Sequence, residues 1–303
     1  MVSSEDRAAL AQLEVRLNTL LPEEYRGAVD VQPTPMGSAA VRYDADGRVA
    51  WDEMWGSFCD LAVAGGPPHK GRLLQPGAAA EIRSVPEQQA EVVREICRGV
   101  RMVADVEGAA APDPGWVRIR VFTDVMAAWL LRAITTENVA IRVTANAVDL
   151  PAGPSFRLEK EIKNVITVMA KTCHYWVGHM PRQQQRSIGR LFDTIAADAP
   201  LIVPSYETEA DVTDMRTALA RRIPRATGLH CAGIGYAGWF GVEVPDVRAA
   251  IWMMRAMIAH NVLARREASI LYLPLQPAGD PGGERVVRVL TRVHHLAAVN
   301  NLL

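Results

Sequence analysis

The feature of this sequence that most constrains its fold is an internal self-similarity. Residues 115–151 match residues 238–274 at a constant offset of 123, without gaps, and 13 of the 37 positions are identical. The shared positions include rare residue types, such as Gly-Trp at the start of both segments and Asn-Val in the middle. A match of this kind indicates a duplicated structural unit.

Both segments show the same order of predicted elements. In the earlier one, alternation over 117–121 predicts a strand, helical spacing predicts a helix over 124–137, and a second strand region (139–150) precedes a helix over 157–177. The later one repeats this order with a strand (240–244), a helix (246–260), a strand (269–273) and a helix (283–299). A fainter, divergent copy is expected upstream, with a strand (39–43), a helix (51–64), a short strand (72–76) and a helix (86–105).

This order predicts an α+β or α/β fold of internally repeated strand-helix-strand-helix units. Neighbouring strands of one unit are expected to be parallel, because strand–helix–strand crossovers are right-handed. The predicted segments are an N-terminal helix and linker (1–37, with the helix at 5–21 and the linker at 28–38), a divergent first unit (38–106), a second unit (115–180), a helical connector (181–235, with a helix at 182–198) and a third unit (236–303). Their combined length also suits one compact domain.

Composition and charge narrow the class of protein. The chain has 33 Lys and Arg against 34 Asp and Glu, and 49% of its residues are hydrophobic. These values are typical of a globular protein and exclude a disordered one. A nucleic-acid partner is not expected, because such proteins carry a basic field. A membrane partner is not expected either, because no run of about 18 apolar residues occurs.

The cysteines and the first residues bear on the compartment. The four cysteines are far apart and form no Cys-x-x-Cys pair, so neither a zinc site nor a disulfide framework is predicted. The chain begins without a basic segment followed by an apolar one, so no secretory signal is predicted. We therefore expect a cytoplasmic protein.

Lysine is rare in this chain, and its placement singles out one helix. The chain has only four lysines, Lys70, Lys160, Lys163 and Lys171, whereas its other 29 basic residues are arginine. On a wheel of the helix 157–177, one stripe within about 60° carries the polar residues Lys160, Lys163, Asn164, Thr167, Lys171 and His174. Two interpretations stay open: a solvated face, or a wall that faces an anion. Cys173 falls on the apolar arc, so it is predicted to be a buried small hydrophobe and not a catalytic partner of His174.

The second candidate is the loop Ala64–Gly71. Gly65 and Gly66 allow a left-handed turn and a close backbone approach, two prolines stiffen the loop, and His69 and Lys70 follow at its tip. This is neither a P-loop nor a dinucleotide fingerprint. The loop is either a rigid connection or a support that presents one histidine and one lysine to a ligand.

These observations lead to three function hypotheses. The first is a soluble enzyme or ligand-handling protein for a small anionic metabolite. Its catalytic candidates are His174, Lys171 and His69, and its substrate-binding candidates are Lys70, Lys160, Lys163, Asn164, Thr167, Gly65 and Gly66. The second is a non-enzymatic accessory protein for cofactor or metal-centre assembly, whose polar stripe docks an acidic partner. The third is a metal-binding protein that uses His69, His174, His179 and the cysteines, although no clustered spacing supports it.

The sequence assigns no role to the remaining histidines and identifies no cofactor. Clustered metal-ligand spacing is not found, no cofactor is identified, and the roles of His179 and of the pair His294-His295 are open. The Met- and Trp-rich helix at 252–257 is a candidate surface for a homo-oligomer or a protein partner.

Overall fold

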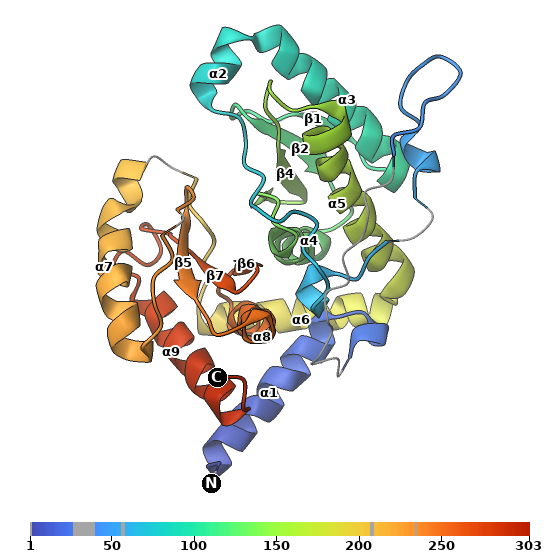
Figure 1. The fold of residues 1–303 in the computed structure, drawn as a ribbon. Coiled ribbons are helices and arrows are strands. Elements are labelled where there is room, and N and C mark those ends of the chain that lie inside the picture. Colours follow the sequence, from blue (N-terminus) through green and yellow to red (C-terminus); the bar gives the residue numbers. More distant parts are fainter. Residues whose placement is uncertain (1, 27–39, 56–57, 207–208, 234) are drawn as a thin grey trace. The chain divides into compact units, whose positions relative to one another are not determined.

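The computed structural model describes residues 2–26, 40–55, 58–206, 209–233 and 235–303 (Figure 1). Over these residues the fold is α+β, as expected. The helices are α1 (Ser4–Leu20), α2 (Ala79–Ser84), α3 (Pro86–Ala104), α4 (Asp124–Thr136), α5 (Lys163–His174), α6 (Arg182–Asp198), α7 (Glu209–Thr227), α8 (Val247–Ala259) and α9 (Glu284–Val299). The strands are β1 (Gly108–Ala110), β2 (Trp116–Arg120), β3 (Arg142–Thr144), β4 (Ala147–Pro151), β5 (Trp239–Glu243), β6 (Arg265–Glu267) and β7 (Ile270–Pro274).

The described residues fall into two compact units. The middle unit comprises Pro33–Ala62 and Gly66–Gln185, and the terminal unit comprises Met1–Gln32, Val63–Gly65 and Arg186–Leu303. The five predicted segments are not tested by this division. The linker predicted at 28–38 lies outside the described residues.

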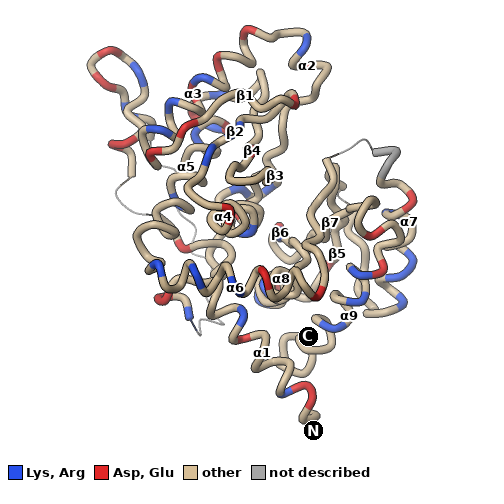
Figure 2. The backbone as a smooth tube through the Cα atoms, turned by 180° about the vertical axis from the view of Figure 1, so that it is seen from behind, with Lys and Arg blue, Asp and Glu red and all other residues tan. Residues whose placement is uncertain are grey.

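The middle unit has a four-stranded antiparallel sheet in the order β1-β2-β4-β3, against which α3 and α4 pack, and α5 packs on α3 and α4 (Figure 1). The terminal unit has a three-stranded antiparallel sheet in the order β5-β7-β6; α8 packs on it, and α9 packs on α8. Basic and acidic residues are both spread over the described backbone of each unit (Figure 2). None of the described helices combines the length and apolar character that a membrane crossing requires.

The two units contain one arrangement of elements with the same spacing. The bounds of α3 and α7, β2 and β5, α4 and α8, β3 and β6, and β4 and β7 all differ by 123. The first turns of α4 and α8 are both capped by a side-chain oxygen, from Thr123 and Asp246 respectively. After each helix an asparagine, Asn138 or Asn261, has φ of 60°. The descent of both units from one duplicated ancestor stays a prediction.

The expected parallel pairing of strands is wrong. Strand β2 pairs antiparallel with β4, with Val117 opposite Leu150. The reason is that the second strand region, expected as one strand over 139–150, is a hairpin of β3 and β4. The turn places Ala145 at φ of 47°. This turn reverses the chain between β3 and β4, so that β4 runs antiparallel to β2.

The helix expected at 51–64 is also wrong, and with it the strand-helix-strand-helix order of the upstream copy. In the described part of this segment only Trp51–Glu53 and Ala62–Ala64 form short 3-10 turns. Tertiary contacts replace a helical hydrogen-bond ladder here: Trp51 Nε1 donates to Glu95 Oε1 at 2.8 Å, and the Ala62 amide donates to the side chain of Glu137. The helix expected at 86–105 is confirmed as α3.

Candidate functional site

The predicted helix 157–177 is confirmed, with a π-helical turn at each end. The turn η4 (Leu158–Ile162) leads into α5, and the turn η5 (Tyr175–His179) follows it. A π-helical turn contains an extra residue, and such turns are frequent at functional sites. Cys173 is buried, as expected, and burial raises the pKa of its thiol to about 12.

The polar stripe of this helix is not a uniformly solvated face. Lys171 and Thr167 are buried, and Lys163 is also buried, whereas Lys160 and His174 are exposed. The hydroxyl of Thr167 donates to the backbone carbonyl of Lys163 at 2.7 Å. Most of the centre of the stripe is therefore covered by protein, whereas its two ends are exposed and Asn164 is half-buried.

The side chain of Glu137 organises the segment that covers the stripe. Its Oε1 accepts hydrogen bonds from the Ala62 amide at 2.9 Å and from Lys171 Nζ at 2.8 Å. Its Oε2 accepts the amide of His69 at 2.8 Å. One buried carboxylate therefore binds a residue before the loop (Ala62), a residue of the loop (His69) and a residue of α5 (Lys171).

Lys171 completes this cluster from the helix. Its ammonium group is fully buried and also donates to Cys59 Sγ at 3.2 Å. Burial by itself lowers the pKa of this lysine, but the charge of Glu137 and the contact with Cys59 outweigh burial and raise the pKa overall. Lys171 is consequently a protonated partner of Glu137 at neutral pH.

The loop that carries His69 lies directly against the stripe. His69 Nε2 is 3.0 Å from Asn164 Oδ1 on α5, within hydrogen-bond distance. Lys70 lies beside it; its amide donates to the backbone carbonyl of Glu137, and its carbonyl accepts the side-chain amide of Asn138. The structure therefore brings together the two features that the sequence analysis selected separately.

The environment of His69 favours the neutral imidazole. Burial lowers the pKa of His69 to about 4, and the positive charges of Lys171 and Lys70 act in the same direction. The charge of Glu137 opposes this shift but does not overcome it. At neutral pH His69 is thus a hydrogen-bonding group and not a proton donor with a pKa near the working pH.

This pKa has a measurable consequence for stability. In the unfolded chain His69 binds a proton near pH 6.5, whereas in the folded protein it stays neutral down to about pH 4. Protonation therefore favours the unfolded state, and His69 destabilises the folded state as the pH falls. In His69→Gln that contribution is lost. We expect the free energy of unfolding of the wild type to fall by up to about 2.5 kcal/mol more than that of the variant between about pH 7 and pH 4.5. Urea unfolding at a series of pH values measures the difference, and parallel curves for the two proteins would contradict it.

His174 belongs to a different group of side chains. Its ring packs against Phe58, Tyr175 and His179, with centroid separations of 5.3, 5.7 and 4.8 Å. Its Nε2 lies 3.1 Å from Nε2 of His179, five residues further along the π-helical turn.

The two glycines of the loop play the steric roles that the sequence indicated. Gly65 has φ of 109°, which side chains rarely adopt. A Cβ at Gly66 would overlap the backbone carbonyl of Asp60. Glycine is therefore favoured at both positions for steric reasons.

Sequence reasoning missed Glu137 and Cys59. One signal was available for Glu137: it is the last residue of the predicted helix 124–137, and a negative charge at a helix C-terminus is unfavourable unless a cation compensates it. The corresponding residue after α8 is His260, which suits that end of a helix better. No pattern in the sequence indicates that Cys59 lies beside Lys171.

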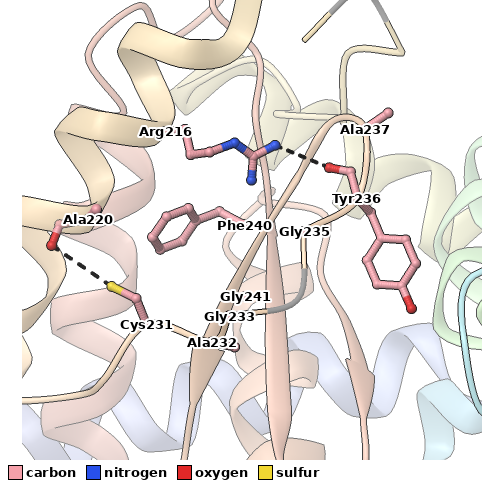
Figure 3. Close-up of a pocket in the computed structure, with 10 residues that line it drawn as sticks. All are labelled: Arg216, Ala220, Cys231, Ala232, Gly233, Gly235, Tyr236, Ala237, Phe240 and Gly241. Carbon is pink, nitrogen blue, oxygen red and sulfur yellow. Dashed lines mark hydrogen bonds between the residues drawn. The ribbon is translucent and has the colours of Figure 1, made fainter.

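The terminal unit contains a pocket of about 550 Å³ at a different place, lined by α7, β5 and residues of the segment between them (Figure 3). Arg216 extends over it and donates to the backbone carbonyls of Trp239 and Tyr236 at 3.2 and 3.3 Å. Cys231 and Phe240 lie at its wall (Figure 3). The pocket is lined by none of the predicted site residues.

Comparison with protein-family models, with curated proteins and with solved structures gave no significant match. Function therefore has to be inferred from the chain's own geometry. Among the described residues, no group of three or more His, Cys, Asp or Glu side chains is placed to hold a metal ion.

Proposed function

We propose that this chain is a ligand-handling protein that binds a small anionic metabolite, with a phosphate or carboxylate group, where the loop Gly66–Gly71 lies on α5. The observation that carries this proposal is the 3.0 Å approach of His69 Nε2 to Asn164 Oδ1. It places the only lysine outside the helix, Lys70, next to the polar stripe that holds the other three.

The structure supports different roles for the four lysines. Lys171 is neutralised by Glu137 and positions the loop. Lys70 is half-buried and Lys160 is exposed, so an anion can reach them from solvent. Lys163 is covered, and burial lowers its pKa. Lys70 and Lys160 are therefore the proposed anion contacts. His69 and Asn164 are the proposed hydrogen-bonding groups of the same site.

The cluster favours binding over imine chemistry. An imine forms only from a neutral amine, and the raised pKa of Lys171 keeps that residue protonated. Its ammonium group is also already engaged by Glu137 and Cys59. We accordingly propose that Lys171 and Glu137 hold the loop in its binding conformation and do not react with the ligand.

Thermal protection tests this proposal. At a concentration about 100 times its dissociation constant, a ligand of the folded state stabilises the protein by about 2.7 kcal/mol. We expect at least one member of a panel of phosphates, phosphorylated metabolites and di- and tricarboxylates to raise the melting temperature by several degrees. In Lys70→Ala and in Lys160→Ala, the ligand concentration that gives the same rise in melting temperature is expected to increase at least tenfold.

The matched control is Arg221→Ala, which removes an exposed basic residue from α7 in the terminal unit. It should leave the protection unchanged. A panel that gives no protection, or protection that Arg221→Ala weakens as much as Lys70→Ala does, would contradict the proposed site.

A further inference from the structure

The π-helical turn η5 brings two imidazole rings together at the end of α5. His174 and His179 are five residues apart, and in a π-helix such residues lie one turn apart on the same face. His174 is exposed and His179 is half-buried, so solvent reaches both. Their Nε2 atoms are 3.1 Å apart and their ring centroids 4.8 Å apart.

The distance between the nitrogens and the distance between the centroids together limit how the two rings can be oriented. A straight hydrogen bond between the nitrogens would place the centroids about 5.4 Å apart, since each nitrogen lies about 1.2 Å from its ring centroid and hydrogen bonds prefer angles above about 150°. The observed 4.8 Å is shorter. The two rings are therefore not collinear, and both distances fit an arrangement in which the Nε2 lone pairs converge on a point beside the line between the two nitrogens.

Two imidazoles that share one metal ion have converging lone pairs, and the distances expected for such a pair can be compared with the observed ones. With metal–nitrogen bonds of about 2.1 Å, imidazoles at 90° to each other have nitrogens about 3.0 Å apart, whereas a tetrahedral angle requires about 3.4 Å. The observed 3.1 Å is close to the first value. The same bond length and angle place the centroids about 4.7 Å apart, close to the observed 4.8 Å.

We propose that His174 and His179 form a binding site for a divalent transition-metal ion with a preference for 90° ligand angles, Ni²⁺ or Cu²⁺. Tetragonal coordination by nitrogen and oxygen is typical of these two ions. The remaining positions on the ion are taken by water or an external oxygen ligand, since the described residues contain no third His, Cys, Asp or Glu side chain placed to complete the site. The neighbouring rings of Phe58 and Tyr175 hold the two imidazoles in place.

Calorimetric titration of tag-free, chelator-treated protein with Ni²⁺ tests this site. We expect one ion per chain with a micromolar dissociation constant, and at least a tenfold weakening in His174→Ala and in His179→Ala, because each variant removes the second ligand of a chelating pair. His294→Ala, which changes one member of the adjacent pair on α9, should bind as the wild type does. Thermal melting of each variant shows whether it is folded.

A spectroscopic measurement separates ligation from a loss of folding. With one equivalent of Cu²⁺, the electron paramagnetic resonance spectrum should show coupling to two imidazole nitrogens in the wild type and to one in each folded variant. Absence of Ni²⁺ binding, or binding that both variants retain, would overturn the proposal. So would a Cu²⁺ spectrum with the same nitrogen coupling in all the proteins.

Discussion

Lys171→Met is expected to lower the free energy of unfolding by about 3–5 kcal/mol. The substitution keeps an unbranched side chain of similar length but removes the ammonium group, and the carboxylate of Glu137 then stays buried with only two backbone amides as partners. An uncompensated buried charge is among the most destabilising changes a single substitution can make. Urea unfolding of both proteins at about pH 7 measures the difference.

A double-mutant cycle identifies the ion pair as the cause. Glu137→Gln leaves the ammonium of Lys171 without its carboxylate, so this variant alone is also expected to be strongly destabilised. When both charges are removed together, the loss should be smaller than the sum of the single losses by about 2 kcal/mol or more. Lys160→Met, at an exposed position of the same helical segment, should cost under about 0.5 kcal/mol. Additive losses in the cycle would show that the two side chains do not stabilise each other.

Gly238→Ala is expected to be the most damaging small substitution in the terminal unit, at about 3–5 kcal/mol. This glycine has φ of 73°, and a Cβ here would overlap the backbone carbonyl of Ser205 and lie 3.1 Å from the ring of Pro204. The clash cannot be relieved locally, because the amide of Ser205 and the carbonyl of Gly238 both bond to the backbone of Leu275 at 2.8 Å.

Gly47→Ala is the control that separates backbone strain from steric overlap. Gly47 also has φ of 73°, but a Cβ at this position would have no atom within 4 Å. We expect this variant to lose only about 1 kcal/mol, the cost of a left-handed conformation for a residue with a side chain. Equal losses in the two variants, measured by denaturant unfolding, would mean that backbone conformation alone explains the effect at Gly238.

Several helices could be predicted from the sequence because their signals are local. Helix α3 begins at Pro86, which is favourable in a first helical turn, and α4 and α8 begin after the capping residues Thr123 and Asp246. The ends of α4 and α8 are marked by Asn138 and Asn261, respectively. Each of these signals depends only on residues within a few positions of the helix.

Strand pairing was harder to predict because it depends on chain reversals. A β-hairpin at 142–151 requires a turn, and turns are usually marked by glycine or by an Asn-Gly pair. Here the left-handed residue is Ala145, which gives no such signal. The segment consequently resembled one strand, and the extra reversal that makes the sheet antiparallel was missed.

The candidate site could be predicted only in part, for a similar reason. The lysines, His69 and Asn164 were selected because their residue types are unusual for their positions. The burial of Lys171 depends instead on Glu137, which lies 34 positions away, and on Cys59, which lies 112 positions away. Because helical periodicity assigns a polar stripe to a surface, it does not show that a loop from another part of the chain covers the middle of that stripe.

The residue that follows the helix differs between the two units: it is Glu137 after α4 and His260 after α8. Both residues follow a helix at the same place in the same backbone arrangement, and an asparagine with φ of 60° comes next in both units. The main chain thus accommodates either side chain here. The side chain at this one position can therefore differ between the two units while the backbone conformation at the end of the helix stays the same.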